Sequence, residues 1–307
     1  MKILVTGGAG FIGSHVVNTY INLGHDVIVI DDLSSGKKEF INPKANFYQL
    51  NIHSPEVKTI LEKEKINVIN HHAAQISVSE SISDPLFDAN SNIISTLQLL
   101  QNAVCLKIEK FIFASTGGAM YGEQEIFPAG EEHPCQPLSP YGISKLSAEK
   151  YINYFCMQYG LNTSILRYSN VYGPYQNPHG EAGVVAIFCQ RLIEGLPPII
   201  YGDGEQTRDF ISVRDITEAN VIALNPQCTG VFNVGTGNEV SVNFLTESLL
   251  KISKLGISAE HGPARKGEQR RSAIDSKNFL KSFGWKPCVS LEEGLVETFN
   301  YFKNKTD

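Results

Sequence analysis

The sequence lacks several features that would assign it to a specialised class of protein. Its cysteines form no CxxC pair and have no regular spacing, which predicts buried thiols in a reducing compartment. No apolar run reaches the roughly 18 residues of a membrane helix. The short run after Lys2 is interrupted at once by Thr6-Gly7-Gly8, so it does not read as a signal peptide. We therefore expect a soluble, cytoplasmic protein without a membrane partner.

An excess of positive charge is also absent. The formal net charge is -6, so the chain has no overall basic field that would collect the phosphates of a nucleic acid. Any anionic ligand must be held by a local cluster of arginines, which favours a small anion over a polymer. The 307 residues are enough for one large α/β unit with a smaller lobe, or for two domains.

What the sequence does contain is a regular alternation of strand and helix patterns. Residues 2–6 and 27–30 are apolar runs typical of buried strands, and the apolar side chains of 11–23 recur at helical spacing. Further apolar runs at 66–69, 111–114 and 163–166 alternate with helical patterns around 55–64, 90–106 and 141–159. This alternation predicts an α/β fold of the Rossmann type, a doubly wound parallel sheet with helices on both faces.

The second half of the chain is less regular. Beyond about residue 170, turn signals such as Leu196-Pro197-Pro198 and Gly202-Asp203-Gly204 separate shorter elements. We predict a Rossmann domain over 1–170, and a smaller C-terminal substrate-binding lobe that takes up most of 171–307, allowing for a return of the chain to the Rossmann sheet. No linker, repeat or low-complexity segment separates the two.

A glycine-rich turn predicts the cofactor. Gly7-Gly8-Ala9-Gly10-Phe11-Ile12-Gly13 follows the first strand and opens the first helix, so pyrophosphate can approach the backbone amides at the positive helix end. Asp31 ends the second strand, where a carboxylate accepts hydrogen bonds from the adenosine ribose and repels the additional phosphate of NADP. The pattern therefore favours NAD, with Asp32 as the alternative ribose ligand.

Tyr141 and Lys145 are the candidate catalytic pair. Ser139 and Pro140 are typical of the N-cap and first turn of a helix, which places the tyrosine and the lysine on one helix face. A free phenol has a pKa of about 10, and a neighbouring ammonium would favour the phenolate and make it a usable base. Thr116 follows a central strand, where its hydroxyl could bind the reacting oxygen.

At this point the sequence resembles the extended short-chain dehydrogenase/reductase family, and within it the UDP-glucose (UDP-galactose) 4-epimerase branch. The motifs that carry the resemblance are TGGAGFIGSH, HHAAQ, STGGAMYG, YGISK, LRYSNVYGP and YGDGEQTRDFISVRD, which span residues 6–215. The resemblance implies that Thr116, Tyr141 and Lys145 are the catalytic hydroxyl, the general base and the lysine that binds the nicotinamide ribose. It implies NAD as cofactor, a homodimer, and epimerisation of a UDP-sugar at C4 through a transient 4-keto sugar.

The resemblance also implies the binding residues. Those for NAD are Gly7, Gly10, Phe11, Ile12, Gly13, Asp31, Asn51, Ile52, Ala73 and Ala74, together with Tyr141 and Lys145. Those for the UDP-sugar are Asn170, Arg208, Arg265 and Glu268, with Ser272 where some relatives carry a bulky tyrosine beside the sugar C2 substituent. Asn51 departs from the aspartate of many relatives, although an amide still accepts a hydrogen bond.

Several alternatives stay open on the sequence alone. An epimerase or reductase of another nucleotide sugar, such as UDP-glucuronate, would use much of the same site. Thr116-Gly117-Gly118 lacks the Thr-Asp-Glu run of the 4,6-dehydratases, which makes dehydration less favoured, and a non-catalytic NAD-binding protein would not need the catalytic residues. His71 and His72 are adjacent on an extended segment and would point to opposite faces, so we predict no metal site.

Overall fold

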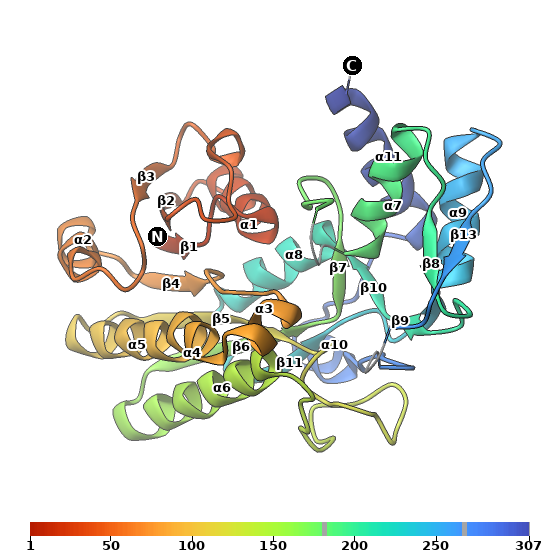
Figure 1. Ribbon diagram of the computed structural model, residues 1–307. Coiled ribbons are helices and arrows are strands. Elements are labelled where there is room, and N and C mark those ends of the chain that lie inside the picture. Colours follow the sequence, from red (N-terminus) through yellow and green to blue (C-terminus); the bar gives the residue numbers. More distant parts are fainter. Residues whose placement is uncertain (180–182, 266–268, 307) are drawn as a thin grey trace. The chain divides into compact units, whose positions relative to one another are not determined.

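The chain forms an α/β structure around one large sheet. The computed structural model describes residues 1–179, 183–265 and 269–306. Seven strands form the sheet in the order β11-β6-β5-β4-β1-β2-β3 (Figure 1). These strands are β1 (Lys2–Thr6), β2 (Asp26–Asp31), β3 (Asn46–Gln49), β4 (Val68–His71), β5 (Lys110–Thr116), β6 (Asn162–Tyr168) and β11 (Gly230–Val234). The order is that of a doubly wound Rossmann sheet, so the predicted fold class is confirmed.

The remaining elements are helices and short strand pairs. The helices are α1 (Phe11–Asn22), the 3-10 helix η1 (Lys38–Phe40), α2 (Glu56–Glu64), α3 (Val78–Ser83), α4 (Pro85–Ala89), the π-helix η2 (Asn90–Ile94), α5 (Ser95–Cys105), α6 (Pro140–Tyr159), α7 (Val184–Ile193), α8 (Val213–Ala223), α9 (Val242–Ser253), α10 (Lys277–Phe283) and α11 (Leu291–Thr306). The short strands are β7 (Asn170–Tyr172), β8 (Ile199–Tyr201), β9 (Thr207–Arg208), β10 (Phe210–Ser212), β12 (Val240–Ser241) and β13 (Glu260–Gly262).

Two compact units are interleaved along the chain. The first consists of Met1–Met120, Pro137–Arg167 and Thr217–Phe232, and the second of Tyr121–Gln136, Tyr168–Ile216 and Asn233–Asp307. The chain thus returns to the first unit after residue 216 and adds β11 at the edge of the sheet. The predicted division into 1–170 and 171–307 is simpler than this arrangement, which has no single boundary.

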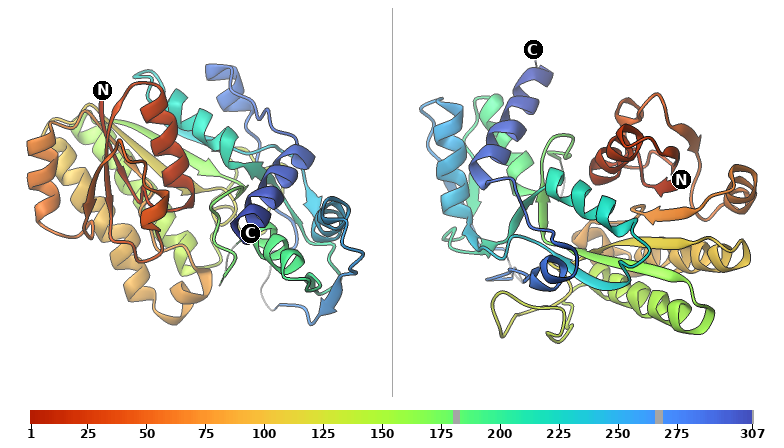
Figure 2. Two further views of the ribbon diagram at one scale, coloured as in Figure 1. Left: turned by 90° about the horizontal axis from the view of Figure 1, so that it is seen from above. Right: turned by 180° about the vertical axis from the view of Figure 1, so that it is seen from behind.

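The first unit is a sheet buried between helices. β1 pairs in parallel with β2 and β4, and β4 pairs in parallel with β5, so these strands are central and covered on both faces. Their side chains are correspondingly apolar, and Ile3, Leu4 and Val5 are fully buried. Helices α5 and α6 pack together and α6 packs on β5, while α1 packs on β1 and β2 from the opposite face (Figures 1 and 2).

The second unit has its own core. Helices α7, α9 and α11 pack against one another, and their apolar side chains surround a cluster that includes Phe188, Leu245 and Phe299. Short strands complete the unit, because β7 pairs with β10 and β8 with β13 in parallel, and β9 pairs with β12 antiparallel. Tyr172 packs against Gly294, where an added Cβ would lie 2.1 Å from the tyrosine hydroxyl. Glycine is therefore required at this contact.

A buried ion pair joins two elements of the first unit. The Arg167 guanidinium on β6 donates to Glu149 on α6 at 2.6 Å, and both side chains are almost fully buried. Ser115 on β5 donates to the same carboxylate at 2.5 Å. Two strands and a helix therefore share one buried charge, whose cost of desolvation is offset by these hydrogen bonds.

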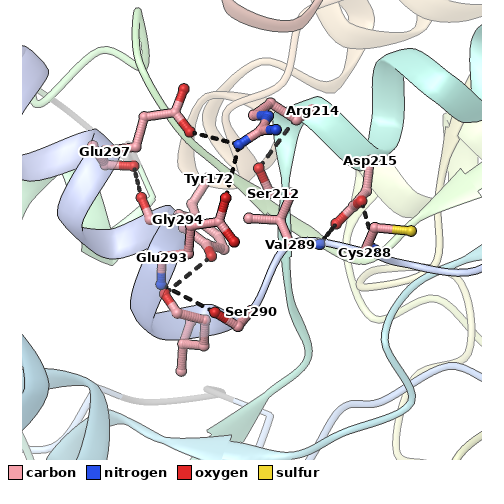
Figure 3. A network of polar contacts seen from close by, with 12 residues as sticks. Tyr172, Ser212, Arg214, Asp215, Cys288, Val289, Ser290, Glu293, Gly294 and Glu297 are labelled. Atoms are coloured by element: carbon pink, nitrogen blue, oxygen red, sulfur yellow. Dashed lines mark hydrogen bonds and ion pairs between the residues drawn. The ribbon is translucent and has the colours of Figure 1, made fainter.

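Removing one partner of this pair should be strongly destabilising. We expect Arg167→Met to lower the free energy of unfolding by about 3–5 kcal/mol, because the Glu149 charge is left buried without its cation. The double variant Arg167→Met/Glu149→Met should be less destabilised than Arg167→Met. Denaturant unfolding at neutral pH measures both. Arg214→Met removes an exposed pair with Glu293 (Figure 3) and is the matched control, with little expected change. An equal loss in the two arginine variants would contradict the prediction.

Candidate active site

The glycine turn between β1 and α1 leaves no room for side chains. Gly7 has φ +69°, and an added Cβ would lie 2.6 Å from the nitrogen of Ala73. At Gly13 a Cβ would lie 2.1 Å from the Gly7 carbonyl oxygen. Gly10 is the N-cap of α1, and the first turn of this helix carries no acidic side chain. The amides and the positive end of the helix are therefore suited to the pyrophosphate of a dinucleotide.

Asp31 is held at the end of β2 by backbone amides. Its two carboxylate oxygens accept from the nitrogens of Ala9 at 2.9 Å and Leu33 at 2.8 Å. Burial raises the pKa of Asp31, and these two hydrogen bonds oppose the increase. Asp32, the alternative ribose ligand, accepts from the Asn51 side chain at 2.9 Å. The geometry brings both carboxylates and Asn51 to the same end of the sheet, with Ile52 packed on the apolar core.

His71 fixes the segment that follows β4. Its Nδ1 lies 2.7 Å from the hydroxyl of Thr6, which also accepts from the nitrogen of Ala73, and its Nε2 lies 3.1 Å from the hydroxyl of Thr96. Burial lowers the pKa of His71 well below its usual value, so the ring is neutral. Because both ring nitrogens have hydroxyl partners, His71 is a structural residue that presents Ala73 beside the glycine turn.

The helix that carries Tyr141 and Lys145 begins where the sequence predicted. Ser139 is the N-cap of α6 and accepts from the nitrogen of Gly142 at 3.2 Å, and Pro140 occupies the first turn. Tyr141 and Lys145 therefore lie one turn apart near the N-terminus of α6. The Lys145 ammonium donates to the carbonyl oxygen of Ala114 on β5 at 3.0 Å. This bond directs the lysine toward the carboxyl end of the sheet.

The electrostatics of Tyr141 differ from the simple expectation that Lys145 lowers its pKa. Burial, followed by the negative charge of Asp88, raises the pKa of the Tyr141 phenol. Burial also lowers the pKa of Lys145 to about 8, although Asp88 and Glu149 oppose this decrease. Desolvation is thus the largest influence on the pKa of both groups.

Thr116 ends β5, the strand against which α6 packs. Its hydroxyl accepts from the nitrogen of Ala119 at 3.2 Å within the turn that follows the strand. The hydroxyl of the preceding Ser115 instead donates to the buried carboxylate of Glu149. Of the two adjacent hydroxyls, Thr116 is the one left at the strand end, and its catalytic role stays a prediction.

One buried carboxylate that contacts this helix was not predicted from the sequence. Asp88 on α4 is fully buried and accepts a hydrogen bond from Ser144, the residue before Lys145. Its other donors are Gln75 and Asn92. No local pattern marks these residues, since an aspartate in a short helix after Asp84-Pro85 reads as an exposed polar position.

Two of the predicted substrate residues are close together in the second unit. Asn170 pairs with Phe210 between β7 and β10, and its nitrogen donates to Asp209, the residue after Arg208. The side-chain oxygen of Asn170 is buried without a hydrogen-bond partner in the described part of the chain. The Arg208 guanidinium is half-buried and donates to the carbonyl oxygen of Thr207 at 2.8 Å.

The segment 269–275 is held beside these residues by backbone hydrogen bonds. The nitrogen of Thr207 donates to the carbonyl oxygen of Arg270. The nitrogen of Ala129 donates to the carbonyl oxygen of Ala273, and the nitrogen of Asp275 donates to the carbonyl oxygen of Ala129. Ser272 is buried here. Arg270 pairs with Asp203, and Arg271 pairs with Glu239 and lies over the ring of Phe127. Each arginine is thus engaged by another group of the same unit.

Arg265 stacks on the ring of Tyr201, with 4.2 Å between the guanidinium carbon and the ring centroid. The side chain is exposed, and its planar donors are suited to an anionic group. Glu268, the fourth residue predicted for the substrate, lies outside the described residues.

A family model gives the decisive comparison. The model described as "NAD dependent epimerase/dehydratase family" matches residues 3–235, about three quarters of the chain. The chain belongs to this family. The predicted family and the NAD requirement that its description carries are therefore confirmed.

Individual relatives cover the full length. The UDP-glucose 4-epimerase of Mycolicibacterium smegmatis is 41% identical over 312 residues, with 100% of both chains covered. The crystal structure of Thermotoga maritima UDP-glucose 4-epimerase with UDP-glucose has a TM-score of 0.97 at 46% identity, and covers 100% of both chains. A UDP-N-acetylglucosamine 4-epimerase from Methanobrevibacter ruminantium, in complex with UDP-N-acetylmuramic acid, has a TM-score of 0.94 at 35% identity over 99% of this chain and 98% of that one.

In the part of the chain that the structure describes, none of the helices combines the length and apolar character needed to cross a membrane.

The position of Asp31 predicts a preference for NAD over NADP. The 2'-phosphate of NADP would face a carboxylate already held in place by two amides, and this like-charge contact should weaken binding by about tenfold or more. Fluorescence titration of the purified chain with the two dinucleotides measures the ratio. Asp31→Ser should reduce that ratio toward one. Equal or tighter binding of NADP to the unmodified chain would refute the assignment of Asp31.

Proposed function

We propose that this chain is an NAD-dependent 4-epimerase of a UDP-sugar, acting through a transient 4-keto intermediate. The observation that carries the proposal is the placement of Tyr141 and Lys145 on the first turns of α6, packed on the strand that ends in Thr116. The named activities of the full-length relatives support the same reaction. UDP-glucose and UDP-galactose are the substrates that we propose first.

Each of the three residues has a different role in the proposed reaction. Tyr141 takes the proton of the sugar 4-hydroxyl, Thr116 donates a hydrogen bond to the same oxygen, and Lys145 holds the nicotinamide ribose. NAD, held at the glycine turn, Asp31 and Lys145, would supply the acceptor for the C4 hydride, and it would be regenerated when the hydride is returned to the opposite face of the 4-keto sugar. The proton returns from Tyr141 to the oxygen in the second half, which balances the reaction.

The raised pKa of Tyr141 has a consequence for this role. With its pKa raised, the Tyr141 phenol stays protonated at neutral pH, and it can accept a proton only if positive charge offsets its desolvation. The Lys145 ammonium supplies one such charge, and the nicotinamide ring of bound NAD supplies a second. We propose that these two charges together would make Tyr141 a usable base.

The UDP moiety is assigned to the second unit. Asn170 and Arg208, brought close together by the β7 and β10 pairing, are the proposed pyrophosphate ligands, with Arg265 as a further cation. Charge-assisted hydrogen bonds from arginine are suited to a diphosphate. Glu268 stays a prediction for the ribose.

Replacement of the phenol tests the proposed function directly. Incubation of the unmodified chain with UDP-galactose should yield UDP-glucose, and the reverse, with no added NADH consumed. Tyr141→Phe keeps the ring and removes the acid/base group, so kcat should fall by about two to four orders of magnitude with little change in NAD affinity. Chromatography of the nucleotide sugars measures turnover. Near-full activity of the variant would assign the base elsewhere, and no interconversion of any UDP-sugar by the unmodified chain would refute the proposed function.

We further propose that the sugar pocket also accepts UDP-N-acetylglucosamine. Ser272 is small, and the neighbouring Arg270 and Arg271 are paired with Asp203 and Glu239. This pairing argues against either arginine filling the space that a tyrosine occupies in some relatives. The named activity of the Methanobrevibacter ruminantium neighbour supports the same substrate class.

A bulky side chain at this position should separate the two substrates. Ser272→Tyr should depress kcat/KM for UDP-N-acetylglucosamine by about tenfold or more relative to UDP-glucose, because the clash is confined to the C2 substituent. Ser272→Ala keeps the space and should retain both activities, and a thermal melt checks that each variant is folded. A uniform loss for the two sugars, or no activity of the unmodified chain on the N-acetylated sugar, would remove the pocket argument.

The homodimer and the cytoplasmic location also stay predictions. Exposed apolar side chains on α6 offer some support for association of two copies, because Ile143, Tyr151 and Tyr154 recur at helical spacing along one stripe of this helix.

A further inference from the structure

Asp88 is a buried carboxylate whose hydrogen-bond donors are all neutral. It lies on α4 and is fully inaccessible to solvent. Ser144 donates to its Oδ2 at 2.5 Å, while Gln75 and Asn92 donate to its Oδ1 at 3.0 Å and 2.9 Å. These bonds satisfy the oxygens, but among the residues that the structure describes no cation contacts the charge, which is costly in the interior unless an opposite charge lies nearby.

The same carboxylate connects the catalytic helix to the predicted cofactor segment. Asn92 lies in the π-helix η2, a wide turn of the kind often found at functional sites. Its side-chain oxygen accepts from the nitrogen of Gln75 at 3.1 Å, and its side-chain nitrogen donates to the carbonyl oxygen of Gln75 at 3.0 Å. Gln75 directly follows Ala73 and Ala74. Asp88 therefore touches α6 through Ser144 and the segment after β4 through Gln75.

Lys145 is the cation that this charge can balance. The ammonium is buried, donates to Ala114 and lies 4.7 Å from the centroid of the Phe113 ring. Ser144, the partner of Asp88, is its neighbour in sequence. Burial lowers the pKa of Lys145, and Asp88 is the first of the two charges that raise it.

The other titratable groups around Lys145 do not substitute for Asp88. Glu149, one turn further along α6, is already engaged by Arg167. Burial lowers the pKa of both His71 and His72 at the end of β4, to about 4 for His72, so neither carries charge at neutral pH. Tyr141 on the same helix is protonated, because burial raises its pKa.

We propose that Asp88 is a positioning residue of this active site: its carboxylate holds the first turns of α6 through Ser144, and its charge keeps the Lys145 ammonium in place for the nicotinamide ribose. The inference rests on the proposed function for the reaction that Lys145 serves, but its consequence for NAD binding is independent of the sugar. Asp88 has no solvent-accessible surface and therefore acts through Ser144 and Lys145.

The affinity for NAD at two pH values tests the proposal. Asp88→Asn keeps the shape and removes the charge, so the pKa of Lys145 should fall further below its value of about 8. Because Lys145 stays protonated well below its pKa and loses its proton above it, NAD binding should weaken severalfold more at about pH 8.5 than at about pH 6.5. Calorimetric titration of the purified chain measures both. NAD affinity is preferred to kcat as the readout because removal of Asp88 also eases ionisation of Tyr141.

Two variants separate charge from packing. Ser144→Ala removes the hydrogen bond but keeps the charge, and it should lower kcat without moving the pH dependence of NAD binding. Asp215→Asn removes another buried carboxylate, one that accepts from the nitrogens of Cys288 and Val289 in the second unit (Figure 3). It should leave the pH dependence of NAD affinity unchanged.

A loss of NAD affinity in Asp88→Asn that is equal at the two pH values, or no loss at either, would overturn the proposal. If Asp88→Asn does not fold, the double variant Asp88→Asn/Lys145→Met decides, because removal of both compensating charges should restore folding. If the double variant does not fold either, the proposal is also overturned. If the unmodified chain epimerises no UDP-sugar, the proposed function fails, while the NAD titrations still judge Asp88.

Discussion

The buried Glu149 carboxylate joins the three elements on which the active site is built. It lies on α6, accepts from Ser115 on β5 and pairs with Arg167 on β6. With its two partners in place, the rotation of α6 about its own axis is fixed. Lys145 one turn earlier, and Tyr141 two turns earlier, then face the carboxyl end of the sheet. The orientation of the proposed catalytic pair is therefore set by an interaction two turns away from the phenol.

The strand–helix pattern of the first unit could be read from the sequence because its causes are local. Fully buried parallel strands need apolar runs, and α6 begins at a serine N-cap followed by proline. Strand β3 was not predicted, since Asn46–Gln49 lies at the sheet edge and is only partly buried. Strand β11 was not predicted either, because it pairs with β6 across more than 60 residues of intervening chain.

The residues of the candidate site also fall into those that local sequence patterns predict and those that depend on contacts between distant segments. The glycine turn, Asp31 and the Tyr141–Lys145 pair have fixed spacings, so the residue types alone indicated their chemistry. Asp88 could not be identified in this manner, because its role follows from contacts with Gln75, Asn92 and Ser144, which come from three different segments. The sequence likewise could not show whether the pKa of Tyr141 is raised or lowered, because desolvation depends on the groups that surround the ring. Ser272 was found only through resemblance, and its burial became visible in the structure.

The interleaving of the two units bears on how such a chain can change in evolution. The polypeptide leaves the first unit after Met120 and after Arg167, and returns to it at Pro137 and at Thr217. A single recombination between two homologous genes at residue 170 would therefore supply β11 from one parent and its neighbour β6 from the other. Exchange of a contiguous half of the gene would therefore disturb the large sheet, whereas a point substitution leaves the pairing of its strands intact.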